Sequence, residues 1–264
     1  MPRFFVQPGQ VDGQNITVTG NDVNHIKNVL RMSCGDTLSV SDGCGRDYFC
    51  TIHEIGREQI YLHIENSWDS YVELKTKLYL FQGLPKGDKM ELIIQKAVEL
   101  GVSAVIPVIT ARTIVKLDEK KTSKRLARWQ SVAESAAKQS GRGLIPQVAA
   151  PVTFKEALTM AGTMDACIMP YERAQGMDAA RSLVDGLKGK KSIGIFIGPE
   201  GGFTPDEVAA AQAAGAKTMT LGRRILRTET AGLAVLSILM FELEDDACDG
   251  RAHENEPILN GRNE

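Results

Sequence analysis

The sequence contains few cysteines, and no two of them lie close together in the chain. Five cysteines are scattered over 264 residues. None of them forms a C-x-x-C pair, which is the spacing typical of structural zinc sites and redox motifs. Their odd number also argues against the disulfide framework of a small secreted protein. We therefore interpret them as free thiols in a reducing compartment, and we expect no metal site.

Long apolar runs are also missing. The longest one near the C-terminus, residues 232–243, contains Ser237 and Glu242 and is well short of the roughly 20 residues that span a bilayer. The first residues, Met1-Pro2-Arg3-Phe4-Phe5, lack the apolar stretch of a signal peptide. The sequence thus predicts a cytoplasmic protein that does not enter a membrane.

The chain as a whole lacks an excess of positive charge, with a formal net charge of −2, but this average hides a division. Residues 1–70 carry 5 basic and 9 acidic side chains, residues 71–241 carry 24 and 16, and residues 242–264 carry 2 and 8. Local density of positive charge decides attraction to phosphate, so the central block is compatible with binding to nucleic acid. The basic run at residues 120–125 is, taken alone, more typical of a solvated helix face.

The first part of the chain has the pattern of a small β-barrel. Segments rich in β-branched and aromatic residues predict strands at residues 16–19, 37–40, 48–52 and 59–64. Turns are expected at Gly20-Asn21, Asp42-Gly43 and Gly56, and one helix over residues 22–32. We assign residues 1–70 to this first domain, whose excess of acid means that any RNA contact there depends on a few placed residues.

From about residue 73 the pattern changes to strands that alternate with helices. Asp88 with Glu91, and Thr153 with Glu156, form capping boxes, and Thr204-Pro205-Asp206-Glu207 opens a further helix. Strands are expected at residues 78–81, 104–109, 165–169, 193–197 and 218–221, and helices at residues 123–139, 177–187 and 230–244. This alternation predicts an α/β domain with a mostly parallel sheet over residues 73–244. Residues 245–264 are polar and predict a disordered tail.

A glycine-rich segment follows one of these strands. Ile197-Gly198-Pro199-Glu200-Gly201-Gly202-Phe203 lies at the sheet edge where α/β proteins bind ligands. It matches neither G-x-x-x-x-G-K-[ST] nor G-x-G-x-x-G, which excludes a Walker phosphate loop and the nicotinamide fingerprint. Taken alone, the segment is also compatible with an ordinary tight turn.

A second unusual connection, L-G-R-R-I-L-R-T-E-T-A, occupies residues 221–231. Most such connections are about 2–6 residues of turn formers, whereas this one is longer and contains isoleucine, leucine and three arginines. We interpret it as a packed, functional loop. A buried structural loop with solvated Arg223 and Arg224 is the alternative.

Together these segments resemble a known family. I-G-P-E-G-G-F-T at residues 197–204 and L-G-R-R-I-L-R-T-E-T-A at residues 221–231 are similar to the paired motifs of the bacterial 16S rRNA uridine-N3-methyltransferases of the SPOUT superfamily. Residues 86–101, the A-A-K-Q-S-G-R block at residues 136–142 and the segment around His25 are similar as well. The resemblance extends from Arg3 to about Glu242.

This resemblance implies a PUA-like β-barrel followed by a SPOUT-type α/β knot, in which the C-terminal segment forms a deep trefoil knot. It implies that S-adenosylmethionine binds in the knot against three loops. It also implies a homodimer that forms through the knot and the final helix, with Ala234, Leu236, Ile238 and Leu239 at the contact. The cofactor-binding residues that it implies are Met169, Pro170, Tyr171, Glu172, Gly198, Pro199, Glu200, Gly201, Leu221, Gly222, Ile225, Leu226 and Arg227.

The implied reaction suggests catalytic roles for three residues. Uracil N3 carries a proton, so the enzyme needs a nearby sulfonium methyl group, a proton acceptor and positive charge beside the base. We assign the positive charge to Arg227 and the acceptor to Glu229 or Glu200, and a purely structural role for either glutamate is the alternative. The residues expected to bind 16S rRNA are Arg3, His25, Arg31, Lys86, Arg112, Gln139 and Arg142.

Two other functions fit the same sequence. A different SPOUT methyltransferase, acting on a ribose 2′-hydroxyl or a tRNA base, would share the glycine loop and the knot. A non-catalytic RNA-binding protein of ribosome assembly would share the scaffold, although the presence of Glu200, Arg227 and Glu229 favours an enzyme.

Overall fold

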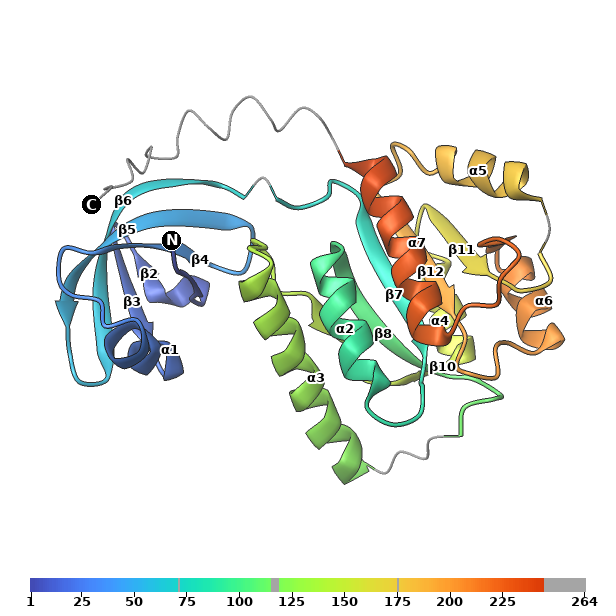
Figure 1. The fold of residues 1–264 in the computed structure, drawn as a ribbon, viewed down its shortest axis with the longest axis horizontal. Helices are drawn as coiled ribbons and strands as arrows, with labels where there is room; N and C mark the ends of the chain where they lie inside the picture. The colour runs from blue at the N-terminus through green and yellow to red at the C-terminus, as the bar shows by residue number, and fades with distance from the viewer. Residues whose placement is uncertain (71, 115–118, 175, 245–264) are drawn as a thin grey trace.

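The computed structural model describes residues 1–70, 72–114, 119–174 and 176–244. These residues form two β-sheets, a curled sheet near the N-terminus and a parallel sheet that carries helices on both faces (Figure 1). The tail expected at residues 245–264 lies outside the described residues.

The first sheet has six strands in the order β1-β4-β5-β6-β3-β2. These strands are β1 (Arg3–Phe5), β2 (Val11–Asp12), β3 (Asn15–Thr19), β4 (Thr37–Ser41), β5 (Arg46–Ile55) and β6 (Gln59–Asp69). Neighbouring strands are antiparallel except β1 and β4. The sheet curls around its own apolar core, in which Ile16, Leu38 and Leu62 are fully buried. All four predicted strands of this part are confirmed.

The helix predicted at residues 22–32 is shorter and less regular than expected. A short 3₁₀ turn, η1 (Pro8–Gln10), precedes it, and the helix itself consists of α1 (Asn21–Asn24) and the π-helical turn η2 (His25–Val29). Arg31 then adopts a φ of 54°, a left-handed conformation that side chains with a Cβ rarely adopt. The helix therefore ends before Met32.

The second sheet is parallel throughout. Its main order is β10-β8-β7-β12-β11-β13, with β9 also paired to β8. The strands are β7 (Lys77–Gly83), β8 (Val102–Ile109), β9 (Gln147–Val148), β10 (Val152–Thr153), β11 (Ala166–Pro170), β12 (Ser192–Ile197) and β13 (Lys217–Met219). Leu80 on β7 and Ile195 on β12 are fully buried at its centre.

Helices cover both faces of this sheet (Figure 1). One face packs against α2 (Lys89–Glu99), α3 (Glu119–Gln139), α5 (Met177–Asp185) and α7 (Thr228–Leu243), and the other against α4 (Phe154–Ala161) and α6 (Pro205–Ala213). This arrangement confirms the predicted α/β class. No helix in the described part of the chain is long and apolar enough to cross a membrane.

One of the two capping boxes predicted from the sequence is present in the structure. Thr153 forms the expected box with Glu156, and Thr204 forms a second box with Glu207 before α6. The box predicted at Asp88 is wrong, because the Asp88 side chain caps nothing. Its partner Glu91 instead forms an ion pair with Arg128 of α3 over 2.6 Å.

The end of α3 joins the two sheets. Lys138 lies 3.1 Å from Asp22 of α1, and the hydroxyl of Ser41 in β4 donates a hydrogen bond of 3.0 Å to the carbonyl oxygen of Gly143. An isolated β-bridge pairs Cys44 with Leu144. The curled sheet is therefore fastened to the segment that follows α3.

Candidate functional site

A cavity of about 480 Å³ opens at the carboxyl ends of β11, β12 and β13. Three connections form most of its wall, namely the loop after β11, the loop between β12 and α6, and the segment between β13 and α7. Its lining residues are Lys89, Pro170, Tyr171, Glu172, Ile197, Gly198, Pro199, Glu200, Gly201, Gly202, Phe203, Thr220, Leu221, Gly222, Arg224, Ile225, Leu226, Arg227, Thr228 and Ala231. A cavity of this size suits a ligand such as a nucleoside derivative.

The glycine loop is folded tightly upon itself. A Cβ atom on Gly198 would lie 2.9 Å from the Cα atom of Gly202, and one on Gly83 at the end of β7 would lie 2.6 Å from Pro199. The N–H group of Gly202 donates a hydrogen bond of 2.8 Å to the carbonyl oxygen of Pro199. Glycine is thus required because parts of the protein approach one another here, before any ligand is considered.

The start of α7 is fixed beneath this loop. Thr228, the first residue of α7, donates a hydrogen bond of 2.6 Å to the carbonyl oxygen of Gly198, and the buried Gln82 of β7 donates one of 2.8 Å to the Thr228 hydroxyl. The last described segment of the chain therefore returns to the centre of the sheet and lies against the glycine loop.

All but one of the thirteen residues expected to hold the cofactor line this cavity. The exception is Met169, which is fully buried in the apolar core on the α4 and α6 face, with Phe196 and Phe203 among its neighbours there. The side chain before Pro170 points into the core because residues alternate between the two faces of a strand. The expected contact of Met169 with the cofactor is therefore left to its backbone, because its side chain faces the core.

Both predicted catalytic carboxylates, Glu200 and Glu229, contact the same lysine. Nζ of Lys89 lies 3.0 Å from Oε1 of Glu200 and 3.5 Å from Oε2 of Glu229. Partial burial acts to raise the pKa of Glu200, but hydrogen bonds from its own backbone, from Lys89 and from the Lys86 N–H group lower it below the ordinary value. The hydrogen bond to Glu200 is also the main reason that the pKa of Lys89 is raised. Glu200 is therefore a carboxylate at neutral pH.

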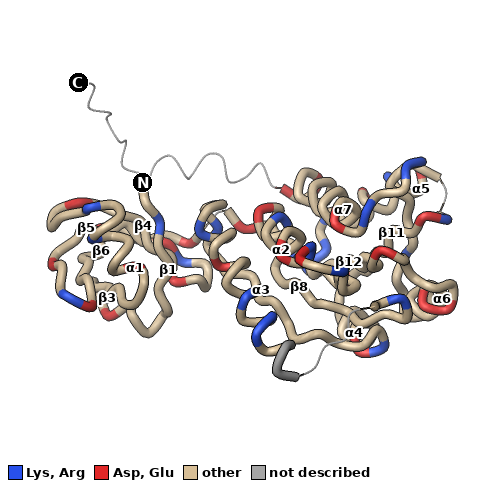
Figure 2. Tube along the Cα trace, turned by 60° about the horizontal axis from the view of Figure 1, so that its bottom comes forward, with Lys and Arg blue, Asp and Glu red and all other residues tan. Residues whose placement is uncertain are grey.

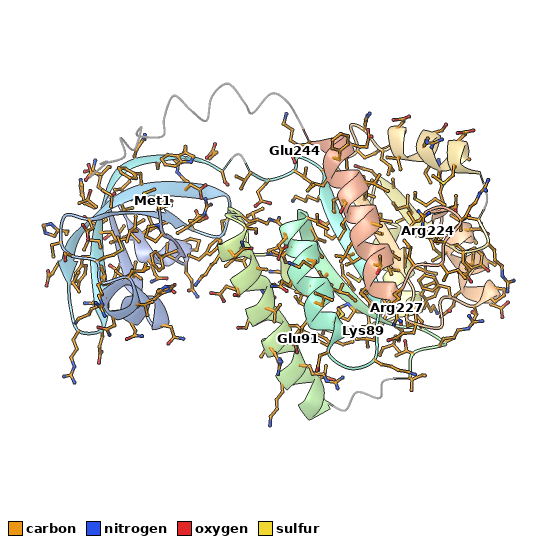
Figure 3. All side chains as sticks on the ribbon, viewed as in Figure 1. Met1, Lys89, Glu91, Arg224, Arg227 and Glu244 are labelled. Carbon is orange, nitrogen blue, oxygen red and sulfur yellow. The ribbon has the colours of Figure 1, made fainter. Side chains whose placement is uncertain are left out.

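Arg227 lies at the mouth of the cavity, close to the N-terminus of α7 (Figure 3). Its side chain is exposed, and no hydrogen bond or ion pair of this side chain is found within the described residues. Its backbone carbonyl accepts a hydrogen bond from Ala231 in the first turn of α7. The backbone of Arg227 is thus held in place while its guanidinium group is available to a ligand.

Two residues expected to bind RNA lie beside the same loop. The backbone N–H group of Lys86 donates to Glu200 over 3.1 Å, and the exposed Arg112 donates a hydrogen bond to the carbonyl oxygen of Gly201. The side chain of Lys86 is exposed. The structure therefore brings Lys86, Arg112 and Lys89 together around residues 200–201.

The other expected RNA contacts are dispersed. Arg3 is partly buried and pairs with Asp47 over 2.6 Å, and His25 is exposed with its ring edge against Phe4. Arg31 in the connection between η2 and β4, and Gln139 at the end of α3, are exposed as well. Figure 2 shows blue segments along α3, and among its described residues Lys124, Arg125 and Arg128 are exposed.

Arg142 does not offer its side chain to RNA. It is 5% exposed, it pairs with Glu73, and it donates hydrogen bonds to the carbonyl oxygens of Val98 and Val102. Glu73 also accepts hydrogen bonds from the backbone of Gly143 and Leu144. We correct the assignment accordingly, because these contacts make Arg142 an internal brace of the segment after α3.

Three polar residues of the site were not identified from the sequence. Lys89 and Thr228 stand within segments of recognised similarity, but their side-chain roles depend on partners elsewhere in the chain. Glu200 lies 111 residues from Lys89, and Gln82 and Gly198 lie 146 and 30 residues from Thr228. Gln82 stands near the end of an otherwise apolar strand. A glutamine in such a strand is the one sequence signal that could have identified a residue of the site. No group of three or more histidine, cysteine, aspartate or glutamate residues within the described ranges could hold a metal ion.

Comparison with known proteins gives consistent matches over most of the chain. Residues 72–240 match the model of an RNA methyltransferase domain, and residues 18–65 match that of an RNA methyltransferase PUA domain. The ribosomal RNA small subunit methyltransferase E of Bacillus subtilis is 38% identical over 250 residues, which cover 92% of this chain and 98% of the relative.

Solved structures agree with these matches. The ribosomal RNA small subunit methyltransferase E of Neisseria gonorrhoeae, bound to S-adenosyl methionine, has a TM-score of 0.78 and 35% identity, covering 91% of this chain and 97% of that one. A putative methyltransferase of Legionella pneumophila in complex with the same cofactor has a TM-score of 0.78 and 30% identity, with coverage of 90% and 96%.

Proposed function

The chain belongs to the ribosomal RNA small subunit methyltransferase E family, and we propose that it methylates N3 of a uridine in the RNA of the small ribosomal subunit. It is an RNA methyltransferase that uses S-adenosylmethionine, and its fold class, a SPOUT-type α/β knot preceded by a PUA-like β-barrel, agrees with the expectation. We propose that residues 1–70 form the RNA-binding domain and residues 73–244 the catalytic domain.

The cavity formed by the three loops is the observation that carries this proposal. Its volume of about 480 Å³ suits a ligand of the size of S-adenosylmethionine. Leu221, Ile225 and Leu226 supply apolar surface for the adenine ring, and the loop at residues 198–202 brings backbone rather than side chains to the ligand. When bound, the cofactor supplies a sulfonium methyl group.

The residues around the cavity then have to stabilise the negative charge that develops on the acceptor base. Uracil N3 becomes a nucleophile only as its proton leaves, and a cation beside the base stabilises the resulting negative charge. Arg227 is exposed at the cavity mouth and its guanidinium is unpaired within the described residues, so we assign this role to it. Lys86 and Arg112 flank the same mouth, and we propose that they bind the phosphates next to the target nucleotide.

Contacts with RNA further from the cavity involve residues in and after η2 and at the end of α3. We propose that His25, Arg31 and Gln139 touch the RNA, because their side chains are exposed. Arg3 is held by Asp47, so its contribution is limited to the part of its side chain that remains accessible.

We also propose that the protein is a homodimer that forms through α7. Leu236 and Leu239, which were expected at the contact, are fully buried in the chain's own core instead. The exposed apolar side chains of α7 are Ile238 (40% exposed) and Phe241 (80% exposed), and Ile225 at the cavity mouth is 88% exposed. Ile238 and Phe241 lie three residues apart on one helix, and two large exposed apolar side chains in this arrangement favour a second protein surface over water.

The transfer of tritium from labelled S-adenosylmethionine tests the proposed function. Small ribosomal subunits and free 16S rRNA from cells lacking this protein should both be offered, and nucleosides from the product should be separated by mass spectrometry. Label in 3-methyluridine supports the proposal. Label in a 2′-O-methylated nucleoside or in tRNA would assign another reaction to the cavity, and binding of RNA without transfer would make the chain a non-catalytic protein.

A further inference from the structure

Lys89 joins two carboxylates beside the cavity. As the first residue of α2, it contacts Glu200 of the loop after β12 and Glu229 of the first turn of α7, at 3.0 and 3.5 Å. These three residues come from distant parts of the chain and meet only in the folded protein. Lys89 and Glu200 line the cavity, and Figure 3 places Lys89 beside Arg227 at the N-terminal end of α7.

The local structure of α2 does not explain a lysine at this position. The N-terminus of a helix carries partial positive charge, so a cation in the first turn is unfavourable. The preceding Asp88 makes no side-chain hydrogen bond to the helix that could offset this effect. The two carboxylates, rather than the helix, therefore account for the placement of Lys89.

The surroundings of the two carboxylates differ. Oε1 of Glu200 accepts hydrogen bonds from the Lys86 N–H group and from Lys89. Oε2 of Glu229 is buried, and its contact with Lys89 is long, at 3.5 Å, without the short hydrogen-bond geometry that Glu200 has. A buried carboxylate oxygen without a donor is unfavourable in its ionised form. Glu229 is therefore the carboxylate of the pair that has fewer hydrogen-bond donors around it.

The charges of this cluster do not cancel. One ammonium group faces two carboxylates, and Lys89 neutralises the one to which it is hydrogen-bonded, namely Glu200. The excess negative charge falls on Glu229, whose side chain keeps 17% of its surface exposed. A proton that arrives on Glu229 makes the cluster neutral.

We propose that Lys89 is a positioning residue for methyl transfer, which holds Glu200 in its ionised form and leaves Glu229 as the carboxylate that accepts the N3 proton of the base. This inference rests on the proposed function. The N3–H bond breaks and its proton passes to Glu229, while the electron pair left on N3 forms the bond to the methyl carbon. The carbon–sulfur bond breaks with its electron pair on sulfur, which yields S-adenosylhomocysteine, and Glu229 later releases the proton to water.

Single-turnover rates of methyl transfer test these roles. The variants are Lys89→Met, Lys89→Arg, Glu229→Gln and Glu200→Gln, and Lys96→Met on the same helix is the matched control. Glu229→Gln should lower the rate by roughly 10²–10⁴, the usual contribution of a general base. Lys89→Met should lower it by at least about tenfold, Lys89→Arg should restore most of the loss, and Glu200→Gln should cost less than Glu229→Gln. Calorimetry should separate losses of affinity for S-adenosylmethionine from losses of rate, and it should show the affinity little changed in Glu229→Gln.

The dependence of rate on pH gives a readout that a purely structural role would not change. With Glu229 as base, the wild-type rate should be nearly flat around neutral pH. In Glu229→Gln the rate should rise about tenfold per pH unit there, because ionisation of N3 in water must replace the lost base.

Three results would overturn the inference: a wild-type rate in Lys89→Met, equal losses in Glu200→Gln and Glu229→Gln, or the same pH profile in Glu229→Gln as in the wild type. If Lys89→Met does not fold, Lys89→Arg and Glu229→Gln decide the question. A wild-type protein that transfers no methyl group to small-subunit RNA would instead overturn the proposed function itself.

Discussion

The hydroxyl group of Thr228 donates a hydrogen bond of 2.6 Å to the carbonyl oxygen of Gly198, 30 residues earlier in the chain. The same hydroxyl accepts a hydrogen bond from Gln82 at the centre of the sheet. This pair of hydrogen bonds connects β7, the glycine loop and the start of α7. The shape of the cavity therefore depends on hydrogen bonds between three segments that are separate in the sequence.

Thr228→Val removes this connection and should weaken both the fold and the cofactor site. Gln82 and the Gly198 carbonyl would each lose a buried partner, which costs about 1–3 kcal/mol of the free energy of unfolding. Calorimetry should show weaker binding of S-adenosylmethionine as well. Thr159→Val on the exposed side of α4 is the control and should change stability by no more than about 0.5 kcal/mol. Unchanged cofactor affinity in Thr228→Val would show that the loop holds its shape alone.

Arg227→Ala should reduce catalysis much more than binding. If the guanidinium group stabilises negative charge on the base, its loss should lower kcat by about 10²–10³ while the affinities for cofactor and RNA change little. Arg181→Ala on α5, also an exposed arginine, serves as the control. A loss of RNA affinity with a normal single-turnover rate would make Arg227 a docking residue.

Arg142→Ala should lower stability rather than act selectively on RNA. Its removal leaves the partly buried Glu73 carboxylate without its ion-pair partner, and breaking a largely buried pair in this way costs up to about 3–5 kcal/mol. Chemical denaturation measures this loss, and Arg57→Ala on the exposed turn between β5 and β6 is the control. Reduced RNA affinity at unchanged stability would restore the original assignment of Arg142 as an RNA contact.

Phe241→Asp should separate the proposed dimer. The wild-type protein at micromolar concentration should scatter light as a particle of twice the chain mass of 28.7 kDa, and the variant as a single chain, because a carboxylate in an apolar interface remains unpaired. Met160→Asp on α4, another exposed apolar position, should leave the dimer intact. A wild-type protein that is active as a monomer contradicts the proposal.

Glu200→Gln should change how stability depends on pH. Because folding lowers the pKa of Glu200, its carboxylate stabilises the folded state above the ordinary pKa of 4.5, and this contribution is lost as the pH falls through the lowered value. The melting temperatures of wild type and variant should therefore differ near neutral pH and converge in acid. Glu54→Gln at an exposed position of β5 should show no such convergence, and a difference that grows in acid would be the wrong sign.

The sequence was sufficient for features that depend on near neighbours in the chain. The alternation of strands and helices, the capping box at Thr153 and the glycine loop at residues 198–202 are all set by residues within one or two turns of each other. The resemblance to a family then identified the three loops, and twelve of thirteen predicted residues line the cavity.

Features that depend on distant partners could not be predicted in the same way. Arg142 was expected to contact RNA because it belongs to the block at residues 136–142 that resembles the family, but Glu73, 69 residues away, draws its side chain inside. Asp88 was expected to cap α2, yet the contacts that matter at this helix start come from Glu200 and Glu229. A single sequence does not show such pairings, because many distant acids are chemically equivalent candidates.

The placement of α7 has a consequence for the order of events during synthesis. Domains tend to fold from the N-terminus as the chain emerges from the ribosome, but residues 220–231 form one wall of the cavity and are among the last described residues to be made. A nascent chain that ends before Thr228 lacks the hydroxyl that holds Gly198. The cavity is thus complete only once the chain has been made as far as α7, so that a product truncated before Thr228 keeps the curled sheet but lacks one wall of the site.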